Sequence, residues 1–300
     1  MEFPHLERLT AAECRQLLPS AAVGRLVVPT PHFPNVEPVS FAVSEGELVV
    51  AVRAGSAGDA MAAGTPVAFE ADVLDRERHQ GWSVVVKGRA EDLDPDVVGR
   101  ARPALTPWPA ATGDRLLLVR SEQITGRRVV NAPPAAVSPP GTAATGPTSA
   151  PPPLTHRDIG AEEALGLLRR GGEPVGRLAV CPAGDPLVFP LNYAVDGDAI
   201  VFRTEAGTKL SAITRSLATF EVDHIDASGQ GWSVSFEGLA QEILDADPAS
   251  LWARIEALRL DAWPGGDRTR IVRMTSYALR GTAWTPAERR ADAAGTFSPA

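Results

Sequence analysis

The sequence predicts a mainly β protein in which one small barrel-like domain occurs twice in tandem. The first observation is an internal repeat: VGRL at 23–26 recurs at 175–178, FAV at 41–43 becomes YAV at 193–195, and GWSV at 81–84 recurs at 231–234. The order is kept and the offset stays between 150 and 152 residues, which indicates a duplication. The second observation is alternation: at 232–237, Trp, Val and Phe alternate with Ser, Ser and Glu, as in a strand with one buried face.

The second copy shows its elements most clearly. Leu165 and Leu168 have helical spacing before Gly171-Gly172, which ends the helix. Asp196-Gly197 lies between two apolar runs and predicts a tight hairpin. In order, we expect a helix at 162–170, strands at 175–181, 187–195 and 199–204, a short helix at 208–216 capped by Thr208, strands at 217–225 and 230–243, a helix at 249–260 and a strand at 270–279. Six short antiparallel strands favour a small barrel.

Domain boundaries follow from composition. Residues 131–153 contain eight prolines and no charged side chain, so this segment is expected to be an extended linker. We therefore expect one domain at 1–130, the linker at 131–153, a second domain at 154–285 and a flexible tail at 286–300.

Composition narrows the class of protein. The net charge of −8 argues against nucleic-acid binding, which needs a basic face. No apolar stretch reaches the length of a membrane span and no signal peptide is seen, so we expect a cytoplasmic protein. Cys14, Cys181 and the five histidines lack metal-ligand spacing, so no metal site is expected.

One segment, 201–210, combines the features of a phosphate site. Arg203 and Thr204 end a predicted strand, Gly207 allows a turn, and Thr208 and Lys209 open a helix. Cations, hydroxyls and free N–H groups at a helix start suit a phosphate monoester. An ordinary solvated turn with a capped helix is the alternative that these residues leave open.

Known catalytic motifs are missing. The chain has no GxGxxG after a strand, no phosphate-binding loop lysine motif and no GxSxG. No catalytic side chain can be named, so in an enzyme a cofactor would carry the chemistry.

The ordered set of strand motifs resembles the pyridoxamine 5′-phosphate oxidase-like superfamily, the FMN-binding split barrels, and most of all its short actinobacterial members. The resemblance covers most of each copy and implies two tandem six-stranded split β-barrels. In that family the flavin lies at a dimer interface. The resemblance implies flavin phosphate contacts at Arg203, Thr204, Thr208 and Lys209, backbone contacts along Leu191, Asn192 and Tyr193, and a wall at Trp232 and Ser233, although both tryptophans at these repeat positions are also expected in the core.

The duplication then implies an intramolecular pseudo-dimer in a monomeric chain. The first copy is expected to be degenerate: Arg53 is matched to Arg203, but Ala54 replaces Thr204, Ser56 replaces Thr208 and Ala57 replaces Lys209. Only the second copy is then expected to hold a phosphate. Arg25 and Arg177 are expected to form structural salt bridges.

The leading functional hypothesis is a flavin-dependent oxidoreductase that acts on a small-molecule substrate through FMN. One alternative is a reductase of the same fold that uses the deazaflavin F420, whose acidic tail would need more basic residues than Arg203, Lys209 and Arg215. Another is a non-catalytic carrier or sensor of flavin or haem.

Overall fold

The computed structural model describes residues 5–44, 46–75, 80–93, 105, 114–130, 154–170, 175–214, 216–226, 228–244, 253, 256, 258 and 269–286 of the 300-residue chain. The predicted linker at 131–153, residues 287–300 and most of the predicted helix at 249–260 lie outside this part. The strands, helices, contacts and cavity of the structure are formed by these described residues.

The first copy forms a seven-stranded antiparallel sheet in the order β1-β7-β4-β3-β2-β5-β6. Pairing of β6 with β7 closes six of these strands into a barrel, and β1 is added outside on β7. Its elements are β1 (His5–Leu9), α1 (Ala11–Leu17), the 3-10 turn Leu18–Ser20, β2 (Gly24–Val28), β3 (Asn35–Ser44), β4 (Glu47–Val52), α2 (Ala57–Ala60), β5 (Pro66–Asp75), β6 (Gln80–Asp92) and β7 (Arg115–Val130).

The second copy repeats this arrangement in the order β11-β10-β9-β12-β13-β14-β8. Pairing of β11 with β14 closes its barrel, and β8 is the added strand. Its elements are β8 (Leu154–Ile159), α4 (Ala161–Arg169), β9 (Val175–Val180), the 3-10 turn Pro182–Gly184, β10 (Leu187–Asp196), β11 (Ala199–Thr204), α5 (Thr208–Ile213), β12 (Leu217–Ile225), β13 (Gly231–Glu242) and β14 (Arg270–Pro286).

The predicted fold class is therefore confirmed: the chain is mainly β and contains two six-stranded barrels in tandem. Each barrel encloses its own apolar core, with Phe69 central in the first and Phe220 and Phe236 in the second. The alternation predicted at 232–237 is seen in β13 from Ser233 on: Val234 and Phe236 are fully buried, whereas Ser233, Ser235 and Glu237 are half-buried, as is Trp232, which packs against the core.

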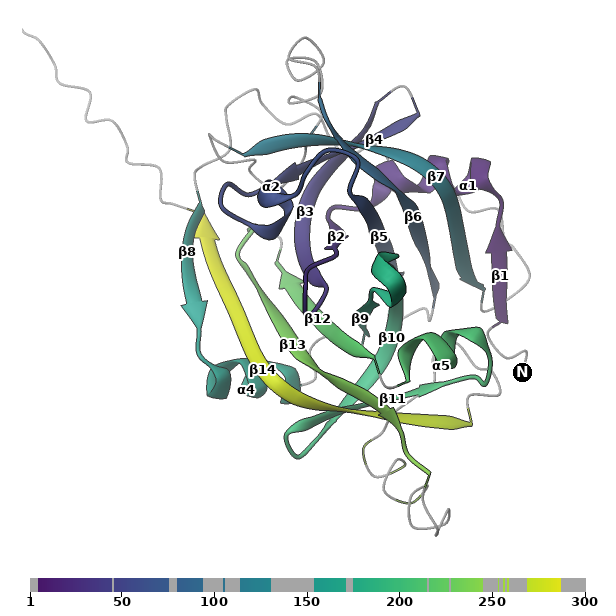
Figure 1. The fold of residues 1–300 in the computed structure, drawn as a ribbon, viewed down its shortest axis with the longest axis vertical. Helices are drawn as coiled ribbons and strands as arrows, with labels where there is room; N and C mark the ends of the chain where they lie inside the picture. The colour runs from purple at the N-terminus through teal and green to yellow at the C-terminus, as the bar shows by residue number, and fades with distance from the viewer. Residues whose placement is uncertain are drawn as a thin grey trace, which may run out of the picture.

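The two barrels face each other across β2, β3 and β5 of the first copy and β9, β10 and β12 of the second (Figure 1). Val27, Val36 and Ala68 of the first copy pack with Ala179 and Val188 of the second in one apolar cluster. The hydroxyl of Thr219 crosses the interface and donates to the carbonyl of Pro34 at 2.6 Å. The copies thus pack in the manner of a dimer, within one chain.

Candidate functional site

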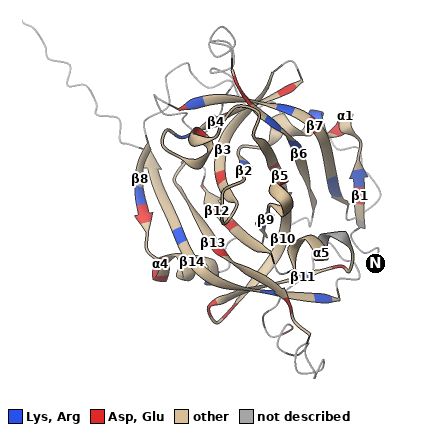
Figure 2. Cartoon of the chain, viewed as in Figure 1, with Lys and Arg blue, Asp and Glu red and all other residues tan. Residues whose placement is uncertain are grey.

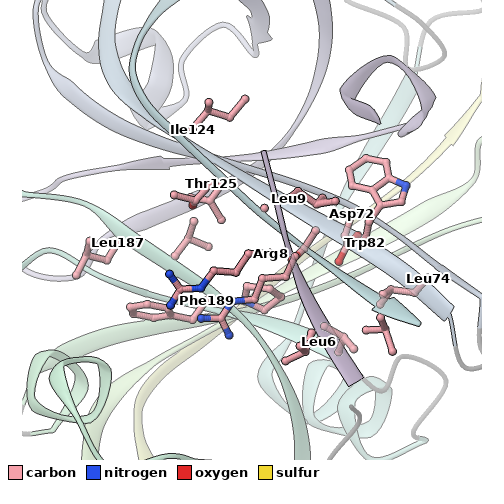
Figure 3. A pocket seen from close by; sticks show the side chains of 18 of the residues that line it. Leu6, Arg8, Leu9, Asp72, Leu74, Trp82, Ile124, Thr125, Leu187 and Phe189 are labelled. Atoms are coloured by element: carbon pink, nitrogen blue, oxygen red, sulfur yellow. The ribbon is translucent and has the colours of Figure 1, made fainter. Parts of the chain in front are cut away.

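A cavity of about 850 Å³ lies between the two copies. Residues of β1, β5, β6 and β7 form one side, here called the first-copy wall, with Ser83, Arg127 and also Trp82, a residue of the first barrel's core, among them. The second-copy wall consists of Val175, the β10 segment from Leu187 to Pro190, Asn192, and Ala212 of α5. Figure 3 shows Leu74 and Trp82 on one side of the space, Leu187 on the other, and Arg8 and Phe189 between them in that view.

Of the predicted ring-contacting residues of β10, Asn192 lines the cavity. Leu191 and Tyr193 flank it and project to the other face, because neighbouring residues of a strand point to opposite sides. Leu191 is buried in the barrel core, and the ring of Tyr193 packs edge-on against Phe220 with centroids 5.1 Å apart. Pro190 lines the cavity on the same side as Asn192.

The predicted phosphate residues lie where β11 ends and α5 begins. Thr204 is 2% exposed and Arg203 is half-buried. Thr208 is the first residue of α5 and does not cap it, because Gly207, at φ 141°, occupies the N-cap position. The side chains of Thr208 and Lys209, and all of Arg215, lie outside the described residues. Ala212 of the same helix lines the cavity, so α5 borders this space.

Trp232 and Ser233 are not among the described residues that line this cavity. The indole of Trp232 stacks on the ring of His224 with centroids 6.2 Å apart, and the hydroxyl of Ser233 donates to Glu221 at 2.8 Å. Their first-copy counterparts, Trp82 and Ser83, do line the cavity, although Trp82 is also buried in the core of its barrel, as expected. The repeat could have indicated Trp82 and Ser83 as lining residues, because in a twofold arrangement each copy's strands border the site of the other copy.

The strand registers correct the match between the two copies at the cradle. Tyr193 pairs with Phe202 on β11, and its counterpart Phe41 pairs with Val50 on β4. The next residue after each partner is Arg203 in the second copy and Ala51 in the first. The equivalent of Arg203 is therefore Ala51, not Arg53, and the equivalent of Thr204 is Val52, not Ala54. Both first-copy residues are buried and apolar, so the first copy has lost the cation as well as the hydroxyl.

A carboxylate of the chain itself occupies the helix start in the first copy. Glu37 on β3 accepts the backbone N–H of Gly58 at 3.1 Å, and it also accepts hydrogen bonds from the hydroxyl of Ser56 and the backbone N–H of Ala57. Burial raises the pKa of Glu37 despite these bonds. At the same repeat position the second copy has Phe189, which lines the cavity and carries no charge. The start of α2 is thus filled internally, and no such carboxylate stands at this position beside α5.

The cavity reaches a buried charge cluster at the interface. Arg25 binds Asp223 of the other copy through two nitrogens at 2.7 and 3.1 Å, and also Asp72 at 3.0 Å. Arg177 binds both oxygens of Asp72 at 2.6 and 2.7 Å, and also Asp223 at 3.1 Å. Arg25 and Arg177 are therefore salt-bridge residues, as predicted, and each joins the two copies.

Two glutamates, Glu70 and Glu221, complete this cluster and are completely buried. Burial, with the neighbouring aspartate charge, raises the pKa of Glu70 to about 7 and that of Glu221 to about 8. One oxygen of each carboxyl group has no hydrogen-bond partner among the described residues. Two guanidinium groups thus face two tightly bound aspartates, while near pH 7 Glu221 is mostly protonated and Glu70 is about half protonated.

The lining residues offer binding surface rather than reactive groups. Aromatic and aliphatic side chains predominate, and Ser83, Thr125 and Asn192 add hydrogen-bonding groups. The part of the chain that the structure describes contains no cluster of three or more His, Cys, Asp or Glu that could hold a metal ion. Such a cavity can hold and orient a flat, partly polar molecule.

None of the helices among the described residues is long and apolar enough to span a membrane.

An uncharacterized protein of Mycobacterium tuberculosis, Rv0080, is 37% identical to this chain over 127 residues, which are 39% of this chain and 82% of that protein. Two solved structures are also similar. An FAD-binding protein from Mycobacterium smegmatis is 27% identical, with 43% of this chain and 98% of that chain covered and a TM-score of 0.34. An FAD-binding protein from Mesorhizobium loti is 22% identical, with 44% and 99% covered and a TM-score of 0.38.

The family model for pyridoxamine 5′-phosphate oxidase matches this chain twice, at residues 10–139 and again at 160–291. The two matches coincide with the two barrels, and together they include the described lining residues of the cavity except Leu6, Arg8 and Leu9 of β1. This chain therefore belongs to the pyridoxamine 5′-phosphate oxidase family, as a tandem duplicate.

Proposed function

We propose that the chain binds one flavin, as FMN, in the cavity between its copies and acts as a flavin-dependent oxidoreductase on a small molecule. The observation that carries the proposal is the cavity itself, because it joins β10 and α5 of the second copy to Trp82 and Ser83 of the first. A volume of about 850 Å³ lies within the range of cofactor sites, roughly 300–1,000 Å³. Family membership supports the same assignment.

The residues of the cavity fit the parts of a flavin. Trp82 and Phe189 supply aromatic surface for a flat ring system. The Asn192 amide can both donate and accept hydrogen bonds at polar ring edges. Arg203 and Thr204 are not among the described residues that line the cavity, but they end β11 next to α5, whose Ala212 does line it, and there they would hold the phosphate.

A bound flavin would supply hydride or electron transfer, and the protein would supply the binding and the surroundings. The apolar side chains of both walls would keep water from the ring, and Asn192 and Ser83 would fix its orientation by hydrogen bonds. Asp72, which lines the cavity, and Asp223 are held by Arg25 and Arg177, so these aspartates would not act as free bases.

The two alternatives from the sequence can be weighed against the lining. Haem iron needs an axial ligand such as His, Cys, Met or Tyr, and none of the described lining residues is of these types. The cavity does carry three basic residues that the sequence hypothesis did not include: Arg8, Lys87 and Arg127. This observation favours ligands with additional negative charge, and it keeps a deazaflavin with an acidic tail as the second candidate.

The first test is the absorbance spectrum of the purified chain, followed by a titration with FMN. We expect bands of oxidised flavin and a stoichiometry of one flavin per chain, because the first copy lacks the cradle and Glu37 fills its helix start. Oxidation of a reduced nicotinamide in the presence of an electron acceptor would establish turnover. A Soret band, or two equal flavin sites per chain, would overturn the proposal.

A pair of substitutions tests the assignment of the cradle. Arg203→Ala gives the second copy the residue that the first copy has at this position, and it should weaken FMN binding about tenfold or more, since a hydrogen bond to a charged group contributes roughly 1.5–3 kcal/mol. Riboflavin, which lacks the phosphate, should bind the variant and the wild type alike. Arg53→Ala is the matched control and should change neither affinity.

A further inference from the structure

A row of polar side chains crosses the first-copy wall. Direct cross-strand pairs join Asp72 on β5 to Ser83 on β6, Ser83 to Arg127 on β7, and Arg127 to Arg8 on β1. Directly opposed residues of antiparallel strands project from the same face of the sheet. All four side chains line the cavity, so the row ends in two adjacent arginines at the side of the cavity that β1 forms.

The two arginines form an unusual pair. Like charges placed directly opposite each other on neighbouring strands repel and destabilise the sheet. Both side chains are exposed, and among the described residues no hydrogen bond or ion pair involves either of them. Figure 2 shows the basic residues of β1 and β7 on these neighbouring strands. Two guanidinium groups held close together form a site that an anion would satisfy.

The second copy provides an internal comparison. Its equivalent row runs from Asp223 through Ser233 to Thr282 and Asp158. Thr282 therefore replaces Arg127, and Asp158 replaces Arg8. The acid and the serine are common to both copies, whereas the arginine pair occurs only in the wall that faces the open second-copy cradle.

The other charges of the wall do not cancel the pair. Asp72 is already bound by Arg177 and Arg25, and Lys87 pairs with Asp185 across the interface at 2.6 Å. The wall is thus locally positive in a chain whose net charge is −8. A cavity lined by one sign of charge concentrates ligands of the opposite sign.

We propose that Arg8 and Arg127 form an anion-binding site in the first-copy wall, and that the molecule seated there carries a carboxylate or phosphate group. The proposal rests on the proposed function for the location of the ligand, and it adds the chemical class that this function lacked. The negative group comes either from the substrate or from the cofactor, and the two sources are separated by experiment.

The test uses the full chain with Arg8→Ser and Arg127→Thr combined. Titration calorimetry with benzoate and with benzamide, its neutral counterpart, measures recognition of a free carboxylate. We expect the wild type to prefer benzoate about tenfold and the double variant to bind the two alike. Recognition of the cofactor's phosphate is measured by titrating FMN and riboflavin and following the quenching of flavin fluorescence on binding. If the preference for FMN over riboflavin falls about tenfold in the double variant, the anion belongs to the cofactor.

Arg128→Thr is the matched control, because it removes the same charge from the neighbouring residue of β7. The Arg128 side chain projects to the other face of the sheet, and its guanidinium lies 3.9 Å from the Glu13 carboxylate. This control should keep the wild-type ratios of benzoate to benzamide and of FMN to riboflavin. The double variant should melt no earlier than the wild type, since its substitutions relieve a repulsion. If both ratios are the same in the double variant and the wild type, the anion site does not exist. The benzoate arm can be run without flavin, so a chain that fails to bind flavin would contradict the proposed function and still leave the arginine pair tested.

Discussion

At the scale of single residues, the two copies differ most where a ligand would be held. Glu37 and Phe189 occupy one repeat position, yet Glu37 binds the start of α2 whereas Phe189 lines the cavity. Ala51 stands where the second copy has Arg203. Each exchange removes a charged or polar group from the first copy or fills the start of its helix, and the proposed function therefore assigns one ligand site to the chain.

Replacement of Glu37 tests how the first site is closed. In Glu37→Ala the Ser56 hydroxyl and the N–H groups of Ala57 and Gly58 lose their acceptor, and we expect the free energy of unfolding to fall by about 1–3 kcal/mol. Glu37→Gln keeps a carbonyl oxygen that can accept these bonds and loses only the buried charge, so it should be close to wild type. Urea unfolding measures both variants.

The Glu37→Ala variant should still bind one flavin per chain, because the first copy has Ala51 where the second copy has the cation of Arg203. A second equivalent of bound FMN in this variant would show that Glu37 alone closes the first site.

Sequence comparison alone could predict part of the site. Asn192 was expected and lines the cavity, and the salt-bridge role of Arg25 and Arg177 was also expected. The match of Arg53 to Arg203 was wrong because a search for identical residue types ignores the strand register, which fixes the offset at 152 throughout this hairpin. The pairing of Arg8 with Arg127 joins residues that are distant in the sequence, so no local pattern indicates it.

At the scale of elements, the long strands of each barrel must bend in order to close. The register between β13 and β14 shifts at Glu237 and Gly238, and the register between β6 and β7 shifts at the equivalent Lys87 and Gly88. Such bulges increase the local twist and bend of a strand. The recurrence of a glycine at both bulges suggests that its lack of a side chain is required there.

Gly238→Ala tests this requirement. A Cβ atom at this position would lie 2.0 Å from the carbonyl oxygen of Thr275, so the strands must separate, and we expect a loss of about 3 kcal/mol in the free energy of unfolding. Gly166→Ala in α4 is the control: a Cβ there meets only the end of the Arg170 side chain at 3.7 Å, and alanine favours a helix. Equal unfolding midpoints for the two variants would contradict the role of the bulge.

The strands were largely predictable because apolar alternation and turn residues are local signals. The strand predicted at 199–204 coincides with β11, and the one predicted at 217–225 coincides with β12. The added strands β1 and β8 were missed, since only Ile159 of β8 is buried and a strand on the outside of a barrel shows no clear alternation. The last strand was predicted to end at residue 279 but continues to Pro286, where β8 pairs with it.

At the scale of the whole molecule, the same interface that forms the cavity also contains the buried charges. The cluster holds two arginines and four carboxyl groups in pseudo-twofold pairs, namely Arg25 with Arg177, Glu70 with Glu221, and Asp72 with Asp223. The repeat made the existence of an interface predictable, but the partners of each charge depend on how the two barrels dock. Because breaking one partner of a buried ion pair leaves an unpaired charge, the cluster ties the position of one copy to that of the other.

The cluster makes stability depend on pH in a defined direction. Glu70 and Glu221 have pKa values of about 7 and about 8 in the folded protein, against 4.5 for an ordinary glutamate. Between these limits the folded chain binds more protons than the unfolded chain, so the free energy of unfolding falls as pH rises. The stabilisation is complete below about pH 4.5 and is lost as pH rises through 7 to 8, and for Glu70 it is on the order of 3 kcal/mol.

Glu70→Gln combined with Glu221→Gln should remove most of this decline, because an amide stays neutral at every pH. Urea unfolding of the full chain at pH 5.5, 7 and 8.5 compares the variant with the wild type, and the variant should gain most in relative stability at pH 8.5. Glu163→Gln is the control, since Glu163 is exposed and its bonds with Arg157 lower its pKa, so it titrates below this range. If the free energies of unfolding of the wild type and the double variant decline in parallel as pH rises, the two glutamates are ionised in the folded state. Two arginines would then face four negative charges at the interface, which would require a docking of the barrels different from the one described.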